Sequence, residues 1–248
     1  MEIFKKVDKG IVRPTNQDAA EAIMLSDNVA FGIVCDGMGG ANGGDIASNR
    51  ATEIICEYVR QSYTPGMNNE AVVKLLKNAI DSANYEVFDC SQREPSLHGM
   101  GTTVVAAIVT GDYAVICHIG DSRAYLINDT IVQLTTDHSI VQSLLQSGKI
   151  SATEAKTFPD KNVITRALGV EENIVIDHSV VHLCAGDVIM LCTDGLSNYV
   201  DSSQIFNTFN TESTDNVADK LIDMANAAGG GDNISVVIIS QKEDGING

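Results

Sequence analysis

The sequence predicts an α+β fold built as a layered sandwich, rather than a strict alternation of strands and helices. Short Val- and Ile-rich runs, broken by Gly-Asp or Asn-Asp turns, are typical of antiparallel hairpins and meanders. Helical pairs separate these blocks of strands. A hydrophobic content of 44% over 248 residues supports an ordinary buried core and, in our interpretation, one large domain.

The first part of the chain is expected to contain a strand followed by two helices. The run "VAFGIVCDG" (29–37) is rich in apolar residues and ends at an Asp-Gly turn, as a buried strand would. Two runs of apolar residues at helical spacing follow it. The first comprises Ala47, Ala51, Ile54, Ile55 and Tyr58, and the second Val72, Leu75, Leu76, Ala79, Ile80, Ala83 and Val87.

The later part of the chain is expected to alternate strands with shorter helices. Strand-like runs lie within 101–128, 178–195 and 233–240, and a helical run of Val217, Ala218, Leu221, Ile222 and Ala225 stops at three glycines. Between 138 and 165 the pattern weakens into two short helices, the second opened by a Ser151–Glu154 capping box, which indicates a flap. We therefore expect one domain over 1–241 and a frayed tail at 242–248.

The charge balance limits the partners that the protein can bind. Sixteen basic and 33 acidic side chains give a net charge of −17, which argues against a nucleic-acid or anionic-membrane surface. The six cysteines form no C-x-x-C pair, and most lie in apolar runs, so buried reduced thiols are expected. Without a signal sequence or a long apolar segment, the chain is expected to be a cytoplasmic protein with no membrane insertion.

The glycine-rich stretch "CDGMGGANGGD" (35–45) raises the question of phosphate binding. A Walker loop is excluded because no lysine occurs between Lys9 and Lys74. A dinucleotide loop is excluded because Asn42 occupies the third glycine position. Asp36 would also repel a pyrophosphate. A metal ion is the simplest partner that reconciles this carboxylate with a phosphate.

Aspartates follow apolar runs at four places in the sequence. Asp36-Gly37, Asp194-Gly195 and Asp232-Asn233 each end or begin such a run, and Asp121 lies in "HIGDSRAYL". Each alone is typical of a turn. Together they predict carboxylates that converge at one edge of the sandwich, where only a cation or raised pKa values would allow them to meet. Oxygen ligands without Cys or His spacing favour Mg²⁺ or Mn²⁺ over zinc.

Arg13 stands five residues before Asp18 in "RPTNQDA", in a segment otherwise poor in basic residues. Its planar guanidinium could bind a phosphate in a bidentate manner. A surface salt bridge is the alternative, and Arg13 alone does not decide between the two.

Eight blocks, in order, resemble the type 2C (PPM) family of metal-dependent protein serine/threonine phosphatases in its compact bacterial form. They are "RPTNQDA", "CDGMGGANGGDIAS", "GMGTTVVAAIV", "HIGDSRAYLI", "LTTDHS", "NVITRALG", "LCTDGLSNYV" and "GGGDNISVVII", which span residues 13–239. The resemblance implies a four-layer α-β-β-α sandwich, with two central antiparallel sheets flanked by helix pairs. It also implies a two-metal centre at one end of this sandwich.

The resemblance further implies a role for each candidate residue. Asp36 would bridge two Mn²⁺ or Mg²⁺ ions and the Gly37 carbonyl would bind one of them, with Asp194 and Asp232 completing the other site. Asp18 would orient a water, Arg13 would hold the phosphate, and Asp121 with Asp194 would bind a weaker third ion. A water bridging the two ions would attack phosphoserine or phosphothreonine directly.

Met38 follows Asp36-Gly37 where many eukaryotic members of this family have a histidine that protonates the leaving group. A water is therefore expected to act as general acid, and His138 in "TTDHS" is expected to have a structural, hydrogen-bonding role. Met38 also excludes a haloacid-dehalogenase phosphatase, which needs an acid at that place. A pseudophosphatase that only binds phosphoproteins is the remaining alternative, although every metal aspartate is present.

The partners implied by the resemblance are phosphorylated proteins. A Ser/Thr protein kinase and its substrates are expected among them, and the protein itself is expected to be a monomer.

Overall fold

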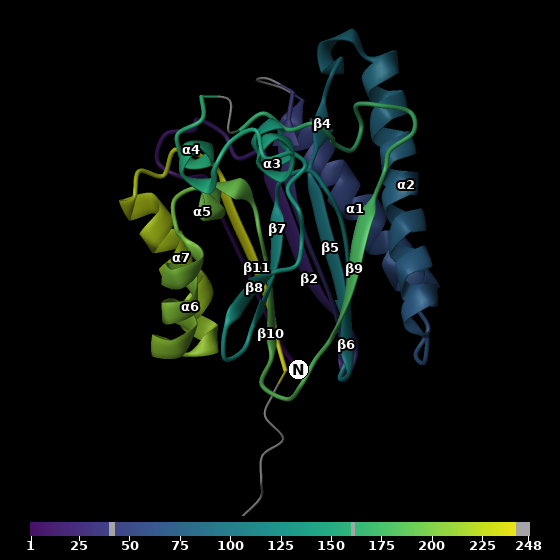
Figure 1. The fold of residues 1–248 in the computed structure, drawn as a ribbon. Coiled ribbons are helices and arrows are strands. Elements are labelled where there is room, and N and C mark those ends of the chain that lie inside the picture. The colour runs from purple at the N-terminus through teal and green to yellow at the C-terminus, as the bar shows by residue number, and fades with distance from the viewer. Residues whose placement is uncertain (40–42, 160–161, 242–248) are drawn as a thin grey trace, which may run out of the picture.

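Two antiparallel sheets packed face to face form the centre of the molecule (Figure 1), in a computed structural model that describes residues 1–39, 43–159 and 162–241. The first sheet has the order β1 (Glu2–Asp8), β11 (Ile234–Ser240), β10 (Val188–Cys192), β7 (Arg123–Ile127) and β8 (Ile131–Gln133). The second has the order β2 (Asp18–Ser26), β3 (Val29–Met38), β5 (Val104–Val109), β6 (Tyr113–Ile119) and β9 (Asp177–His182), with β4 (Gly101–Thr102) paired to β3.

A helix pair covers the outer face of each sheet (Figure 1). Helices α1 (Gly44–Ser62) and α2 (Asn69–Arg93) pack on the second sheet, and the 3₁₀ turn η2 (Pro95–Leu97) follows α2. Helices α6 (Ser202–Thr211) and α7 (Thr214–Ala227) pack on the first sheet, next to the short helix α5 (Asp194–Ser197). The predicted four-layer α+β sandwich is thus confirmed.

Strand β3 shows why the sequences of the central strands are continuously apolar and do not alternate between apolar and polar residues. Phe31, Ile33 and Cys35 face the α1–α2 layer, while Ala30 and Val34 face the opposite sheet, and all five are fully buried. A strand between two hydrophobic layers needs apolar side chains on both faces, so its sequence reads as a continuous run.

The helices begin at recognisable caps. The Asn68 side chain accepts a hydrogen bond of 2.9 Å from the N–H of Ala71 at the start of α2. Asp201 and Gln204 form a capping box at the start of α6. Of the helical run predicted over 47–58, Ala47, Ala51 and Ile55 are buried as expected, whereas Ile54 and Tyr58 are only half-buried.

The sequence analysis assigns neither the edge strands β1 and β2 nor helix α6, and it also leaves out the short elements η2, β8 and α5. Strands β1 and β2 each lie at the edge of a sheet, where one side has no neighbouring strand and burial is partial. Their sequences, "EIFKKVD" and "DAAEAIMLS", mix charged residues or alanines with apolar ones, which weakens the strand pattern.

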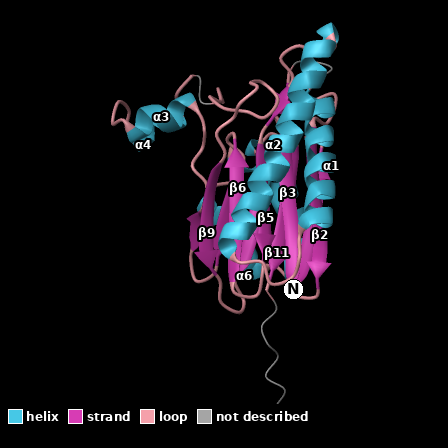
Figure 2. Cartoon of the chain, turned by 90° about the vertical axis from the view of Figure 1, so that its right-hand side faces the viewer, coloured by secondary structure: helices cyan, strands magenta, loops and turns pink. Residues whose placement is uncertain are grey.

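The segment expected to be a flap contains α3 (Ile140–Gln146) and α4 (Ala152–Lys156). These helices project from one end of the sandwich, away from the sheets (Figure 2). The predicted Ser151–Glu154 capping box opens α4. The tail 242–248 and residues 160–161 of the flap lie outside the described residues.

Four of the six cysteines are buried (Cys35, Cys56, Cys117 and Cys192), and none of the six forms a disulfide. Cys184 departs from the expected burial because it lies on an exposed turn. Among the described residues, no helix has the length and apolar character needed to cross a membrane.

Candidate metal centre

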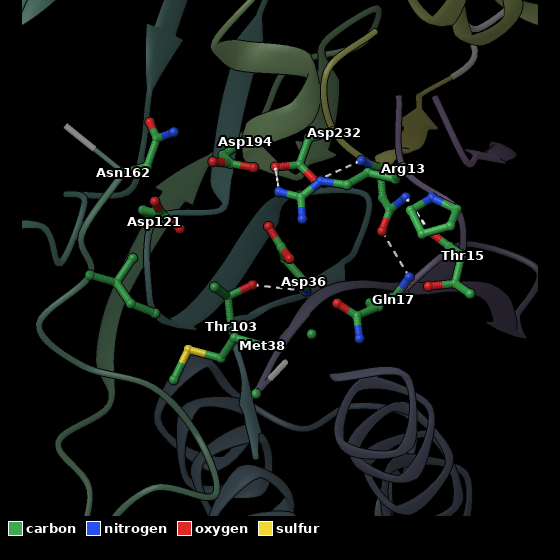
Figure 3. A pocket seen from close by; sticks show the side chains of 15 residues that line it. Arg13, Thr15, Gln17, Asp36, Met38, Thr103, Asp121, Asn162, Asp194 and Asp232 are labelled. Atoms are coloured by element: carbon green, nitrogen blue, oxygen red, sulfur yellow. Dashed lines mark hydrogen bonds and ion pairs between the residues drawn. The ribbon is translucent and has the colours of Figure 1, made fainter. Parts of the chain in front are cut away.

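A cavity of about 450 Å³ opens at the end of the sandwich that carries the flap. Figure 3 shows its lining, in which carboxylates from several strand ends point toward one space. Of the residues singled out in the sequence, the cavity brings together Arg13, Asp36, Gly37, Asp121, Asp194 and Asp232. Asp18 is not part of the lining but is buried directly behind Asp36 on the neighbouring strand.

Hydrogen bonds to its main chain fix the position of Asp36 near the end of β3. Its N–H donates to Thr103 Oγ1 at 3.0 Å, and its carbonyl accepts from the Thr103 N–H at 2.9 Å. The Thr102 hydroxyl donates to the same carbonyl at 2.9 Å. These contacts use the main chain of Asp36, and its carboxyl group lies in the cavity.

Gly37 is required because two other stretches of backbone approach it closely. A Cβ atom at this position would lie 2.0 Å from the Gly44 carbonyl oxygen and 2.5 Å from that of Gln17, both impossible contacts. The Gly37 N–H donates to the Gln17 carbonyl at 3.1 Å. The glycines at either end of this loop therefore allow β3, α1 and the segment before β2 to meet. Residues 40–42 lie outside the described part of the chain.

Asp194 and Asp232 are brought together by a similar close approach. A Cβ atom on Gly195 would lie 1.9 Å from the Asn233 carbonyl oxygen, so the backbone after Asp194 packs on the backbone after Asp232. The Asn198 side chain also donates to Asp194 Oδ2 at 2.9 Å. Both Asp-Gly dipeptides thus mark places where backbones touch.

The side chain of Asn233 connects this corner to the segment that carries Arg13. Its Oδ1 accepts from the Gln17 N–H at 2.8 Å, and its Nδ2 donates to the carbonyls of Lys9 at 2.8 Å and Thr15 at 3.0 Å. Asn233 thereby holds the 9–17 segment at the rim of the cavity.

Asp18 and Asp36 are direct cross-strand partners in β2 and β3. Two carboxylates in this relation repel each other. Asp18 is 6% exposed, and its Oδ2 accepts hydrogen bonds of 2.8 Å from the hydroxyls of Thr193 and Ser235. Its other oxygen, Oδ1, is buried and has no hydrogen-bond partner in the described structure.

Burial raises the pKa of four carboxyls of this cluster, those of Asp18, Asp36, Asp121 and Asp194. It raises the pKa of Asp18 to about 7, and the charges of Asp194 and Asp232 act in the same direction. Asp121 likewise has a pKa of about 7, because of burial and then the charge of Asp194. The pKa of Asp36 lies well above its usual value, and that of Asp194 is also raised, in both cases first by burial and then by neighbouring carboxylates.

Arg13 forms an ion pair within the cavity. Its NH2 donates to Asp232 Oδ2 at 2.8 Å, and its Nε donates to the Gly231 carbonyl at 3.4 Å. Half of the Arg13 side chain is exposed, so the pair contributes about 1 kcal/mol at most to folding. The salt bridge considered in the sequence analysis therefore exists, and its partner is one of the candidate metal ligands.

The loop that carries Asp121 is held by the root of the flap. The Gly120 N–H donates to His138 Nδ1 at 3.1 Å, and the His138 N–H donates to the Gly120 carbonyl at 2.9 Å. Gly120 has φ +105° and packs against Thr103. As expected, His138 makes structural hydrogen bonds.

His118, His138 and Asp177 form a second cluster, in which possible ligand atoms lie within 4.8 Å of one another. The two rings stack with centroids 4.9 Å apart. Because His138 Nδ1 accepts the Gly120 N–H, the neutral ring carries its proton on Nε2, which lies 3.2 Å from Asp177 Oδ2. That nitrogen then has no lone pair with which to bind a metal ion. We therefore interpret the cluster as structural, with hydrogen bonds that hold the loop of Gly120.

Sequence reasoning missed four residues of the site: Gln17, Thr103, Asn162 and Asn233. All lie inside the motif blocks quoted above, and Gln17 and Asn233 adjoin the candidate residues Asp18 and Asp232. Their polar, uncharged side chains carry no chemical signal of their own. Gln17 and Asn233 share a block with a candidate aspartate, which could have indicated them, whereas the blocks of Thr103 and Asn162 contain no candidate ligand.

Comparisons with known proteins identify the family of this chain. A family model described as protein phosphatase 2C matches residues 12–227. The serine/threonine phosphatase stp of Listeria welshimeri is 38% identical over 239 residues, which cover 96% of this chain and 94% of that protein.

Solved structures of such phosphatases share the whole fold. The serine/threonine phosphatase Stp1 from Staphylococcus aureus superposes with a TM-score of 0.91 at 31% identity, covering 98% of this chain and 95% of its own. The catalytic domain of the phosphatase PstP, solved with two manganese ions, has a TM-score of 0.81 at 30% identity, covering 96% of each chain. With a family model over most of its length and relatives above 30% identity, the chain belongs to the protein phosphatase 2C family.

Proposed function

We propose that this serine/threonine protein phosphatase hydrolyses phosphoserine and phosphothreonine at a centre of two Mn²⁺ or Mg²⁺ ions, with a weaker third ion beside them. The observation that carries the proposal is the convergence of Asp36, Asp121, Asp194 and Asp232 on one cavity that also contains Arg13. Listeria and Staphylococcus relatives described as serine/threonine phosphatases support the reaction class, and a relative solved with manganese supports dependence on a divalent metal.

The residues of the cavity fit such ions. Carboxylate and main-chain carbonyl oxygens are the ligands that Mg²⁺ and Mn²⁺ prefer. The buried oxygens Asp18 Oδ1 and Asp194 Oδ1 have no hydrogen-bond partner in the described structure, which is costly unless a cation or water satisfies them. The raised pKa values of Asp18 and Asp36 show that ionised carboxylates are unfavourable here without nearby positive charge.

Each candidate residue takes a definite role in this proposal. Asp36 would be a ligand to both ions, the Gly37 carbonyl to one of them, and Asp194 with Asp232 to the other. Asp121 and Asp194 would hold the third ion. Such ions would supply a water of lowered pKa and would neutralise the charge that develops on the phosphoryl oxygens.

The surrounding side chains position the reactants. Asp18, fixed by the hydroxyls of Thr193 and Ser235, orients the attacking water from behind Asp36. Arg13 binds the phosphate and exchanges its contact with Asp232 for the substrate. Met38 lines the cavity but has no proton to donate, and none of the residues lining the cavity is a histidine, so a water protonates the leaving oxygen.

The partners follow from this activity. We propose that the protein acts in the cytoplasm, as a monomer, on phosphorylated proteins that include a Ser/Thr kinase and its substrates. A pseudophosphatase that only binds phosphoproteins is the alternative, and turnover separates the two.

Asp36→Asn, Asp194→Asn and Asp232→Asn should each abolish phosphate release from a phosphothreonine peptide in Mn²⁺, because each removes a negatively charged ligand. A chelator should abolish the wild-type rate in the same assay, and Asp129→Asn, on an exposed turn, should leave the rate unchanged. Near-normal turnover by any of the three variants would contradict the ligand assignment. A wild-type protein without turnover in any divalent metal would favour the pseudophosphatase.

Arg13→Ala should lower kcat/KM on the phosphopeptide. The corresponding loss of transition-state stabilisation should be about 1.5–3 kcal/mol, the usual contribution of a hydrogen bond to a charged group. Arg13→Lys should recover only part of the loss, because an ammonium group cannot bind two phosphate oxygens in a planar fork. Metal affinity, measured by calorimetry, should change little by comparison. Wild-type kinetics in the alanine variant would leave the Asp232 ion pair as the only role of Arg13.

Asp121→Asn should stabilise the metal-free protein at pH 8 but not at pH 4. The folded-state pKa of Asp121 is about 7 against a usual value of 3.8, so the unfolded chain ionises first as the pH rises. The carboxyl therefore costs no stability below pH 3.8, and its full cost is present above pH 7. In chelator, Tm should rise by about 2–4 °C for each kcal/mol relieved.

The control for this experiment is Asp129→Asn, which removes an exposed carboxyl and should show no such change with pH. Equal Tm values for Asp121→Asn and the wild type at both pH values would mean that the ionised Asp121 carboxylate does not destabilise the folded protein.

A further inference from the structure

A second cavity, of about 260 Å³, adjoins the metal cavity. Met38 and Ile164 line both cavities, so the two spaces lie on either side of the same pair of side chains. A polypeptide whose phosphorylated residue enters the first cavity would pass over or beside the second. Its position makes the second cavity part of the same binding cleft.

The side chains that line the second cavity are mainly apolar. Besides the two shared residues they include Ile119, Ala167, Val170, Ile174 and Val175. Val170 and Val175 are 42% and 63% exposed, which is unfavourable for aliphatic side chains beside a cleft unless something covers them. An uncharged, apolar group is therefore the natural occupant.

The two charged side chains of this cavity do not change that conclusion. Arg166 NH1 lies 3.2 Å from Asp177 Oδ1, so an acidic side chain of the protein itself already balances its charge. Glu171 carries a negative charge that would oppose a phosphate or a second acidic group at this place. The cavity is thus poorly suited to a further anion.

Hydrogen bonds hold the walls of the cavity in place without a ligand. Asn84, 2% exposed on α2, donates from Nδ2 to the carbonyls of Glu171 and Glu172, each at 3.0 Å, and its Oδ1 accepts from the Gly169 N–H at 2.7 Å. One buried side chain therefore fixes the loop on which Val170 is carried.

The stretch just before this loop, residues 165–168, is also anchored. The Thr165 N–H donates to the His138 carbonyl at 2.7 Å, and Leu168 exchanges two main-chain hydrogen bonds with Thr102. A cavity whose lining segment is held in place can select a shape, because little binding energy is spent on ordering it.

The volume of the cavity limits what it can bind. Pockets for cofactors and drug-sized molecules usually have volumes of about 300–1,000 Å³, whereas one aliphatic or aromatic side chain needs less. We propose that the second cavity binds one apolar side chain of the phosphoprotein substrate, within three residues of the phosphorylated position. This inference rests on the proposed phosphatase function and adds a sequence preference to it.

Phosphothreonine peptides that differ at one position test the proposal directly. A single leucine is moved through positions −3 to +3 of an otherwise Ser- and Gly-rich peptide, and kcat/KM is measured in Mn²⁺. Leucine should raise kcat/KM about 10-fold or more over serine at one position, or at two positions on the same face of the extended peptide. The gain corresponds to the free energy of transferring a leucine side chain from water to an apolar cavity.

Variants connect this preference to the cavity. The double variant Val170→Asn/Val175→Asn keeps the net charge and changes two exposed side chains, and the preference for leucine should fall below about 3-fold. Val132→Asn is the matched control, because Val132 is a 49% exposed valine on β8, outside both cavities, and should retain the full preference.

Each outcome decides the proposal. Equal rates on all peptides, or a preference that survives in the double variant, would overturn it while leaving the phosphatase activity intact. A loss of preference in Val132→Asn as well would show a general effect on stability and would also overturn it. Absence of phosphate release from every peptide and from p-nitrophenyl phosphate would overturn the proposed function together with the inference.

Discussion

Repulsion among carboxylates is the constraint on which the organisation of this molecule depends. Four aspartates line one cavity: Asp36, Asp121, Asp194 and Asp232. Asp18 is paired with Asp36 on the adjacent strand β2. Such an arrangement is unfavourable when the carboxyls are ionised, and the raised pKa values of Asp36 and Asp121 agree with this. The sandwich must therefore supply enough stability elsewhere to hold these groups at one end, and the three buried apolar layers do so.

The contacts around the cavity hold backbones in place and leave the acidic oxygens available. Gly37 and Gly195 let neighbouring main chains approach to within distances that no Cβ atom would permit. Thr103 anchors the main chain of Asp36, and Asn233 anchors the segment that carries Arg13. His138 holds the loop of Asp121 to the root of the flap. Rigid support of this kind preorganises a site before its ions or substrate arrive.

Much of this could be predicted from the sequence, for reasons that differ between elements. Strand β3 and helices α1, α2 and α7 have long apolar patterns set by burial, so their type was evident. Edge strands β1 and β2 are half-buried, and their mixed composition hid them. Asp36, Asp121 and Asp194 were found because they stand at or just after the ends of strands β3, β6 and β10, and Asp232 because it precedes the apolar run of β11. Asn162 and Asn233 were missed, since their roles depend on contacts that only the folded chain reveals, such as the 2.8 Å bond from Gln17 to Asn233.

In the proposed function, metal ions would replace protons in the carboxylate cluster. This replacement is tested most directly by titrating Mn²⁺ into the metal-free protein at pH 7, by calorimetry in buffers with different ionisation enthalpies. Because Asp18 and Asp121 have pKa values of about 7 and that of Asp36 is also raised, binding should release protons, and the observed enthalpy should vary with the buffer. Binding without any proton release, or no binding of Mn²⁺ at all, would contradict the account.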